Sequence, residues 1–295
     1  MTQPVVVRCL APSIYGETPL SDIETQVAEF IYRHCDKPYI EIEAKLGLLL
    51  SKKTHDRFWK TFEVINSEAI LFSDPQFVHP YEFLTSIPKE LFETVNMALN
   101  DRYQHSKEPG YVGAPIHCQH FIERDWIYGR GQKMRASVDS DGNVLKCVKK
   151  TRVEDLNIIS RHTGLDWRLS ASTEEPVPPP PLDMIEQERR KHRCSYFFEL
   201  WRFDLTRVDV YKQEMLQESV YQIEIEIRDI STFAKRKEEI MNNSDDATAT
   251  EPPLDKIMFG SFPSGVQLTD LARAFVSNVR ATIIIAGELE EAEED

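Results

Sequence analysis

The chain has 295 residues, 41% of them hydrophobic, and a formal net charge of −14 at pH 7. Its length suits one large globular domain or two small ones. No stretch reaches the ~20 apolar residues of a membrane-spanning helix, and the N-terminus lacks a signal-peptide pattern, so we expect an intracellular protein. The acidic balance argues against a long basic groove that follows a nucleic-acid backbone, so a polyanionic substrate would be held over a small part of its length.

Apolar periodicity predicts three helices with eight strands between the first and the last. The first helix covers about residues 21–34, where Ser21 and Glu24 form a capping box. Two more amphipathic helices are expected over residues 89–102 and 269–280. So many strands with one polar face predict a closed or nearly closed antiparallel barrel, with helices covering the outside. The expected strands are 38–50, 113–128, 132–138, 143–153, 165–174, 188–199, 200–208 and 219–228.

Composition divides the remaining segments into loops and a tail. A proline run breaks the strand pattern between residues 175 and 187, and polar residues dominate 242–256, so we expect both segments to be mobile. Residues 288–295 form an acidic run that is typical of a solvated tail. We therefore expect one catalytic domain over residues 1–287, followed by the tail.

The five cysteines are widely spaced and include no Cys-x-x-Cys pair. This usage predicts reduced thiols in a cytosolic or nuclear protein and gives no support for a zinc finger. The segment His117-Cys118-Gln119-His120 lacks a second pair of Cys or His residues at zinc spacing. We therefore expect no metal site there.

Two segments far apart in the chain share an alternating pattern of carboxylates, Glu41-Ile-Glu-Ala-Lys45 and Gln222-Ile-Glu-Ile-Glu-Ile-Arg228. Successive side chains of a strand point to opposite faces, so the carboxylates of each segment share a face opposite apolar residues. The apolar face packs on protein, which leaves the carboxylates facing an enclosure. Like charges gathered there must take up protons, attract cationic side chains or hold a hard metal ion such as Mg²⁺ or Mn²⁺. Either segment taken alone is typical of a solvated strand.

Basic residues occupy alternate positions of the central strands. Each row alone is typical of a solvated face, but together with the carboxylates they describe a lumen. Carboxylates with a divalent metal on its floor and Arg and Lys on its walls would suit a chain of phosphates. The rows are Lys133 and Arg135; Lys149, Lys150 and Arg152; Arg168, Ser170, Ser172 and Glu174; Arg189, Lys191 and Arg193; and Arg202, Asp204 and Thr206.

In these blocks the chain resembles the fungal mRNA-capping RNA 5′-triphosphatases, the metal-dependent branch of the triphosphate tunnel metalloenzymes. The resemblance implies an α+β fold, in which an eight-stranded antiparallel β-barrel sheathed by helices carries the active site in its tunnel. The order of the blocks is more specific than one Glu-x-Glu-x-Lys motif. They are Glu41-Ile-Glu-Ala-Lys-Leu-Gly47, Lys133-Met-Arg-Ala-Ser137, Cys147-Val-Lys-Lys150, Arg189-Arg-Lys-His-Arg193, Arg202-Phe-Asp-Leu-Thr206, Glu224-Ile-Glu226 and Asn278-Val-Arg280.

The resemblance also implies roles for the matching positions. The metal ligands for Mg²⁺ or Mn²⁺ would be Glu41, Glu43 and Glu226, with Glu224 beside them. The phosphates would contact Arg135, Lys191 and Arg193, supported by Lys45, Lys133, Arg189 and one of Lys149 or Lys150. The wall row would be Arg202, Asp204 and Thr206, and Glu174 would position the attacking water. Gln222 departs from the family, which usually has a glutamate there, so it adds no charge to the site.

The function implied by the resemblance is hydrolysis of the γ-phosphate of 5′-triphosphate RNA to a 5′-diphosphate end, the first step of mRNA capping in the nucleus. The implied partners are an mRNA guanylyltransferase, the RNA polymerase II tail and a second copy of the chain. Two alternatives remain open. One is a tunnel phosphohydrolase for free nucleoside triphosphates or polyphosphate, and the other is a non-catalytic triphosphate-binding subunit.

Overall fold

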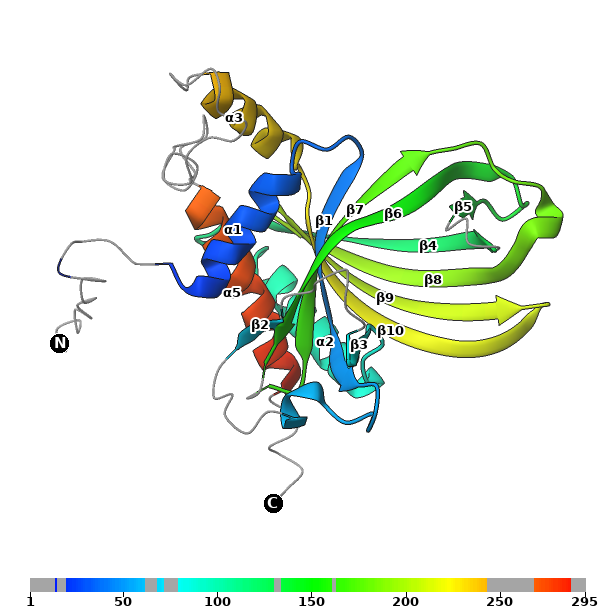
Figure 1. Cartoon of the computed structure of the whole chain (residues 1–295), viewed down its shortest axis with the longest axis horizontal. Coiled ribbons are helices and arrows are strands. Elements are labelled where there is room, and N and C mark those ends of the chain that lie inside the picture. The colour runs from blue at the N-terminus through cyan, green and yellow to red at the C-terminus, as the bar shows by residue number, and fades with distance from the viewer. Residues whose placement is uncertain are drawn as a thin grey trace.

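Eight antiparallel strands close into a barrel in the computed structural model, which describes residues 14, 20–61, 68–71, 79–129, 134–160, 163–242 and 268–287 (Figure 1). Around the barrel the order is β1-β7-β6-β5-β4-β8-β9-β10, and β10 pairs with β1 to complete it. The predicted barrel is therefore confirmed. Its strands are β1 (Ile40–Ser51), β4 (Ile116–Tyr128), β5 (Met134–Val138), β6 (Val144–Ile159), β7 (Asp166–Pro176), β8 (Ile185–Phe198), β9 (Trp201–Lys212) and β10 (Met215–Ile227).

Each barrel strand corresponds to one of the predicted strands, with ends that differ by a few residues. The long β6 extends beyond the expected end because it also pairs with a short strand, β2 (Ala69–Leu71). A second short strand, β3 (Tyr81–Leu84), pairs with the far end of β1. Neither short strand was predicted, because three or four residues carry too little periodicity to identify a strand.

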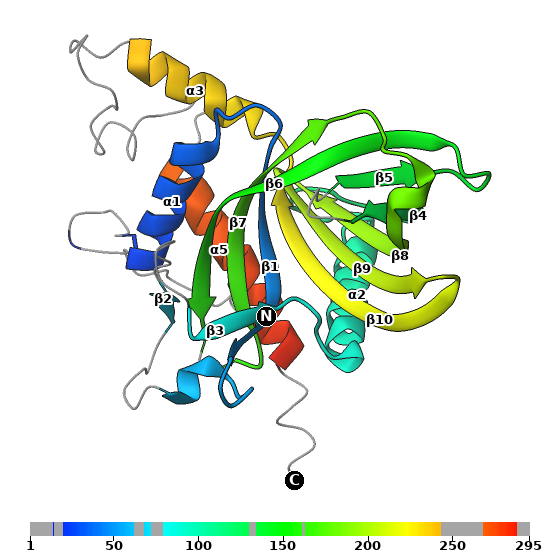
Figure 2. The same cartoon turned by 45° about the vertical axis from the view of Figure 1, so that its right-hand side comes forward.

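Helices α1 (Asp22–His34) and α5 (Leu268–Gly287) lie side by side against one end of the barrel (Figures 1 and 2). The Ser21–Glu24 capping box is present, as predicted. Two further helices are α2 (Lys89–His105) and α3 (Ser231–Asn242), and the second of these was not predicted. Within the described part of the chain, no helix is both long and apolar enough to cross a membrane.

The core lies between these helices and the outward faces of the strands. Ile42 and Ala44, which alternate with the carboxylates of β1, are fully buried there. The ring of Trp201 on β9 lies 5.4 Å from the ring of Phe275 on α5. Helix α5 continues beyond its predicted end because Ile283 and Ala286 also face this core. Burial of each large apolar side chain stabilises the fold by about 1.5–3 kcal/mol.

Gly47 marks the place where β3 crosses close to β1. A Cβ atom at this position would lie 2.2 Å from the carbonyl oxygen of Leu84 and 2.8 Å from the ring of Phe83. Only a glycine lets the two backbones approach this closely.

The segment 175–187 is described and contains a short turn of 3₁₀-helix, Leu182–Met184. Residues 243–256 and the acidic run 288–295 lie outside the described residues. The predicted boundary between a domain over 1–287 and a tail therefore stays a prediction.

Candidate active site inside the barrel

The barrel holds a cavity of about 690 Å³ whose lining is mostly charged. Because successive side chains point to opposite faces of a strand, one set of alternate positions from each of the eight strands faces this cavity. The cavity brings together most of the site residues predicted from the sequence. These are Glu41, Glu43, Lys45, Arg135, Lys150, Glu174, Arg189, Lys191, Arg193, Arg202, Thr206, Glu224 and Glu226.

The two carboxylate segments form one wall, because β1 and β10 are neighbours. Glu43 pairs in register with Glu226, and Lys45 pairs with Glu224. The ammonium group of Lys45 lies 2.9 Å from Glu43 and also contacts Glu224. The two alternating patterns recognised in the sequence are therefore halves of one site.

Lys150 on β6 adds a second ammonium group to this wall. Its Nζ contacts Glu41, and it lies 3.2 Å from Glu43 and 3.5 Å from Glu174. Lys149 pairs in register with Glu175 and is exposed on the outside of the barrel. The choice that the sequence left open is thereby decided in favour of Lys150.

The carboxylate wall carries more negative charge than the nearby cations neutralise. Burial and the charge of Glu43 raise the pKa of Glu41 above its ordinary value, in spite of Lys150. Burial raises the pKa of Glu226 to about 8; its pairing with Arg202 opposes this shift, and repulsion from Glu41 and Glu43 adds to it. Carboxylates with raised pKa values favour the addition of a cation.

Glu224 differs from the other carboxylates of this wall. Burial acts to raise its pKa, but Lys45, together with Lys150 and Arg193, outweighs burial and lowers the pKa to about 2. Burial likewise opposes the charge of Lys45, and attraction from Glu224 and Glu43 reverses that effect and raises its pKa. Lys45 and Glu224 therefore form a permanently ionised pair.

Arg135 and Glu174 form an ion pair on the adjacent wall. Nη2 of Arg135 lies 3.0 and 3.2 Å from the two carboxylate oxygens of Glu174. Burial opposes ionisation of Glu174, but Arg135, Lys150 and Lys146 together lower its pKa. Glu174 therefore holds Arg135, a candidate phosphate-binding residue, in place.

Asp125 on β4 is a buried member of this site that the sequence reading missed. Its carboxylate lies 2.5 Å from Nζ of Lys191 and 3.9 Å from Nε of Arg135, and it accepts a hydrogen bond of 2.7 Å from Ser137. Burial raises the pKa of Asp125, but Lys191 and Arg135 reverse that effect and keep the pKa low. The signal was present, since Glu123 and Asp125 alternate as Glu41 and Glu43 do.

A hydrogen-bonded row holds the remaining arginines. Asp204 lies 3.0 Å from Nε of Arg202 and 3.4 Å from Nη1 of Arg193, and it accepts a 2.6 Å hydrogen bond from Ser195. Arg193 also donates to Thr206, and Arg202 contacts Glu226. Asp204 is not part of the cavity lining and lies beside both guanidinium groups, within the wall row that the family resemblance implies.

Other predicted residues lie elsewhere. Lys133 falls outside the described residues. Arg152 pairs with Asp155 at 3.1 Å, and Arg168 donates to Asn157 at 2.7 Å, so both side chains are engaged away from the cavity. Among the ion pairs of the described residues, Arg189 has no carboxylate partner, although it lines the cavity.

Gln222 lines the cavity but does not join the carboxylates. Its amide nitrogen donates a hydrogen bond of 3.1 Å to the hydroxyl of Thr85, in the segment that follows β3. The expectation that Gln222 adds no charge is consistent with this contact. Thr85 also lines the cavity, although the sequence analysis assigned no role to the segment that contains it.

Sequence comparison identifies the family. The profile described as "mRNA capping enzyme, beta chain" matches residues 17–252, which is most of the chain. The chain belongs to this family. This agrees with the resemblance drawn from the residue blocks, and the match includes every carboxylate and basic residue of the cavity.

Named relatives of this chain come from several fungi. The "mRNA-capping enzyme subunit beta" of Schizosaccharomyces pombe is 31% identical, over 67% of this chain and 65% of its own length. The Candida albicans protein of the same name is 27% identical over 95% of this chain and 51% of its own length. The "Polynucleotide 5′-triphosphatase CTL1" of Saccharomyces cerevisiae is 26% identical over 64% of this chain and 61% of its own length. The chain thus spans 40–65% of the length of these curated relatives and others that it matches.

The fold comparison agrees with the family assignment. The solved structure of the S. pombe Pct1 RNA triphosphatase has a TM-score of 0.76 and 25% sequence identity, and the match covers 94% of this chain and 98% of that one. The same protein in complex with the Spt5 CTD gives a TM-score of 0.75. The capping enzyme beta chain fold therefore extends over nearly all of this chain.

Proposed function

We propose that this chain is a metal-dependent RNA 5′-triphosphatase, which hydrolyses the γ-phosphate of 5′-triphosphate RNA and leaves a 5′-diphosphate end. The observation that carries the proposal is the barrel cavity, in which a wall rich in carboxylates faces walls rich in guanidinium and ammonium groups. Such an arrangement suits a short chain of phosphates that needs both a cation and direct basic contacts. The family assignment supports the same reaction.

The basic walls supply the phosphate contacts. Arg135, Lys191 and Arg193 line the cavity, and each pairs with a carboxylate on a strand: Glu174 for Arg135, and the buried Asp125 and Asp204 for Lys191 and Arg193. Guanidinium groups bind phosphate oxygens through two parallel hydrogen bonds, and fixed donors stabilise charge without reorganising during the reaction. Arg189 is available to a phosphate because it has no carboxylate ion pair among the described residues. Lys45 and Lys150 line the cavity beside the carboxylates.

The carboxylates fit a hard divalent cation. Glu41, Glu43 and Glu226, with Glu224 beside them, would hold Mg²⁺ or Mn²⁺, because carboxylate oxygen is the preferred ligand of both ions. The raised pKa values of Glu41 and Glu226 support a wall that favours added positive charge. Among the described carboxylates, no three have oxygens gathered within 4.8 Å, so the side chains would rotate to bind the ion. When bound, the ion would neutralise charge on the phosphate oxygens.

Glu174 is the proposed positioning group for water. It stays ionised because Arg135, Lys150 and Lys146 lower its pKa, so it can accept a hydrogen bond from a water molecule in the cavity. Its contacts with Arg135 would place this water next to a residue that binds phosphate. Alignment of the water with the β–γ bond is what phosphoryl transfer needs from the protein.

The wider setting is also proposed. The names of its relatives, "mRNA-capping enzyme subunit beta", support a role in nuclear mRNA capping beside a guanylyltransferase. A solved complex of Pct1 with the Spt5 CTD supports a link between this chain and the transcription apparatus. The RNA polymerase II tail is a further proposed partner. A homodimer remains the proposal drawn from the family resemblance.

The test is release of labelled γ-phosphate from 5′-triphosphate RNA, with and without Mg²⁺ or Mn²⁺. Glu41→Ala and Glu226→Ala should each lower the rate about a hundredfold or more, since fixed groups that stabilise a transition state contribute this much. Glu174→Ala should also release phosphate slowly. Glu175 is an exposed neighbour on β7, so Glu175→Ala should release phosphate at the rate of the original chain.

Three other outcomes would change the assignment. Release from free nucleoside triphosphates or polyphosphate, but not from RNA, would indicate a tunnel phosphohydrolase for small substrates. Binding of 5′-triphosphate RNA without release of phosphate would indicate a non-catalytic subunit. Release that continues without a divalent cation would contradict the proposed role of the carboxylates.

A further inference from the structure

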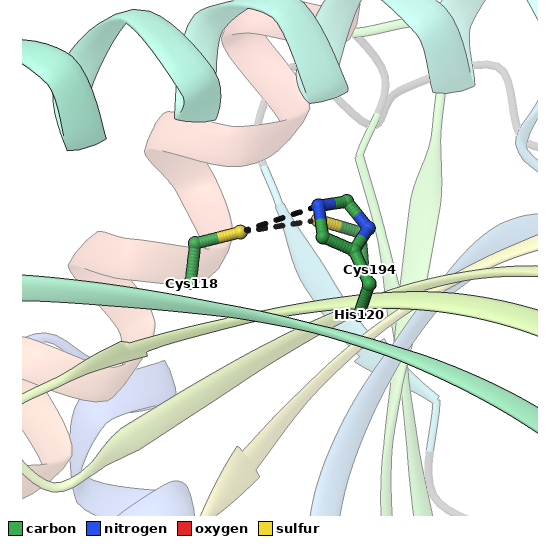
Figure 3. A group of neighbouring side chains, drawn as sticks. All are labelled: Cys118, His120 and Cys194. Atoms are coloured by element: carbon green, nitrogen blue, oxygen red, sulfur yellow. Dashed lines mark hydrogen bonds between the residues drawn. The ribbon is translucent and has the colours of Figure 1, made fainter.

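Three potential metal ligands meet on the outer face of the barrel, away from the cavity. Cys118 and His120 project from β4, and Cys194 projects from the neighbouring strand β8 (Figure 3). The two sulfur atoms lie 3.4 Å apart, and Nε2 of His120 lies 3.9 Å from each of them. The sequence predicts no metal site here, because it shows no second pair of ligands at zinc spacing. The strand register, which the sequence spacing does not show, brings Cys194 to Cys118 and His120.

Strand register disfavours a disulfide between these cysteines. His120 lies directly opposite Cys194, whereas Cys118 lies opposite Tyr196. Cys118 and Cys194 are therefore diagonal neighbours, whose Cα atoms are typically about 7–8 Å apart. A disulfide requires Cα atoms within about 4.4–6.8 Å. A metal ion bound by both sulfur atoms does not require the two Cα atoms to lie this close.

The separations match those of a tetrahedral zinc site. With Zn–S bonds of about 2.3 Å and Zn–N bonds of about 2.0–2.1 Å, tetrahedral ligand atoms are roughly 3.5–3.8 Å apart. The S···S separation of 3.4 Å and the two S···N separations of 3.9 Å each lie within about 0.4 Å of these values. We propose that Cys118, His120 and Cys194 bind one Zn²⁺ ion through two thiolates and a neutral imidazole. Binding would release the two thiol protons to solvent.

The donor set selects a soft or borderline metal, unlike the carboxylates of the cavity. Thiolate and imidazole ligands suit Zn²⁺, whereas Mg²⁺ and Mn²⁺ prefer oxygen. The sheet separates the two sites, since Asp125, Lys191 and Arg193 on the same two strands point into the cavity. The outer site would therefore bridge β4 and β8 without sharing ligands with the proposed catalytic ion.

Three protein ligands leave one tetrahedral position for a fourth ligand. His120 is exposed to solvent, and Cys118 and Cys194 are partly buried, so water can reach the ion. In Figure 3 the group lies between the strands and helix α2. The site would thus hold a structural ion with one exchangeable ligand, beside the place where α2 covers the barrel.

Cobalt substitution distinguishes this site from the cavity. Titration of the reduced, metal-free full chain with Co²⁺ should produce a near-ultraviolet thiolate-to-cobalt charge-transfer band, which carboxylate-bound cobalt cannot give. One equivalent of Zn²⁺ should abolish the band. Cys118→Ser and Cys194→Ser should each reduce it strongly, and His120→Asn should weaken it. His192→Asn is the matched control, because His192 is an exposed histidine on the same outer face of β8, two residues from Cys194.

A second readout keeps the proposal testable if a cysteine variant folds poorly. A ligand that binds only the folded state raises stability by mass action, so Zn²⁺ should raise the Tm of the original chain and of His192→Asn. The rise should be clearly smaller in His120→Asn, whose substitution is on the surface. No charge-transfer band in the original chain, a band unchanged in Cys194→Ser, or a Cys118–Cys194 disulfide in the metal-free protein would each overturn the proposal.

Discussion

Asp125 of β4 and Lys191 of β8 form a buried ion pair inside the barrel, with 2.5 Å between Oδ2 and Nζ and side chains that are 1% and 10% exposed. The carboxylate of Asp125 also lies near Arg135, so one acidic group holds two basic residues that face the cavity. Asp125 therefore acts as a positioning residue for the basic wall.

Asp125→Asn should reduce the proposed triphosphatase activity, because the amide keeps the shape of the side chain but not its charge. A residue that orients functional groups typically contributes about ten- to a hundredfold. We expect a fall of this size in kcat/KM for 5′-triphosphate RNA. The alkaline limb of the pH profile should also move to lower pH, because Lys191 loses its counter-ion. An unchanged profile with lower activity would indicate a structural role alone.

Lys191→Arg should extend activity to higher pH. Burial and the positive charge of Arg135 lower the pKa of Lys191, although Asp125 partly opposes this shift. Lys191 therefore loses its proton at a lower pH than an ordinary lysine, and phosphate binding weakens as the pH rises through that value. An arginine stays charged throughout this range. The measurement is kcat/KM against pH, and an alkaline limb at the same pH in both proteins would contradict the assignment.

The sequence was sufficient to predict the barrel because its strands are long enough for a period of two to be visible. The same alternation placed Glu41, Glu43, Glu224 and Glu226 on inward faces before any pairing was known. Asp125 was missed because its role depends on β4 lying between β5 and β8, an order that differs from the order along the chain.

Pairing also explains the other differences between sequence and structure. Cys194 meets Cys118 only through the register of β4 and β8, which neither strand's own pattern contains. Strands β2 and β3 are too short to show a period, and each exists because a longer strand provides its partner. A single sequence thus leaves the pairing between distant strands, and the contacts that depend on it, undetermined.

Lys150→Ala and Lys149→Ala are a matched pair that separates the cavity from the outer surface. Lys150 contacts Glu41 and lies near Glu43 and Glu174, whereas Lys149 is exposed. Removal of the Lys150 ammonium should slow phosphate release by about a hundredfold, and Lys149→Ala should leave the rate within about twofold. Urea unfolding of both variants checks that the fold persists. Equal losses of activity in the two variants would show that activity does not depend on which of the two lysines faces the cavity.

Protonation of His34 should lower stability in mild acid. Burial lowers the pKa of His34, and Arg33 and Lys37 add to the shift, although its hydrogen bond to Glu154 acts in the opposite direction. In the unfolded chain the pKa returns to about 6.5. Below that pH the unfolded state binds the proton first, so the free energy of unfolding falls until the pH passes the lower pKa of the folded state. His34→Gln, which does not titrate, should lose less stability than the original chain between about pH 7.5 and 5. Identical pH dependence in urea unfolding of the two proteins would contradict this.

Gly47→Ala should destabilise the barrel where β3 crosses β1. The added Cβ would lie 2.2 Å from the backbone carbonyl oxygen of Leu84, and a backbone atom cannot move aside as a flexible side chain can. Overpacking of this kind typically costs about 1–3 kcal/mol. The measurement is the free energy of unfolding in urea. Gly110→Ala is the contrasting variant, because no atom lies within 4 Å of its added Cβ, and its cost arises from a φ of +88° alone. Gly47→Ala should also alter phosphate release. Thr85 follows β3 and accepts a hydrogen bond from Gln222 in the cavity, so a displaced β3 would disturb the cavity lining. Full stability and activity in Gly47→Ala would show that the two backbones can separate without cost.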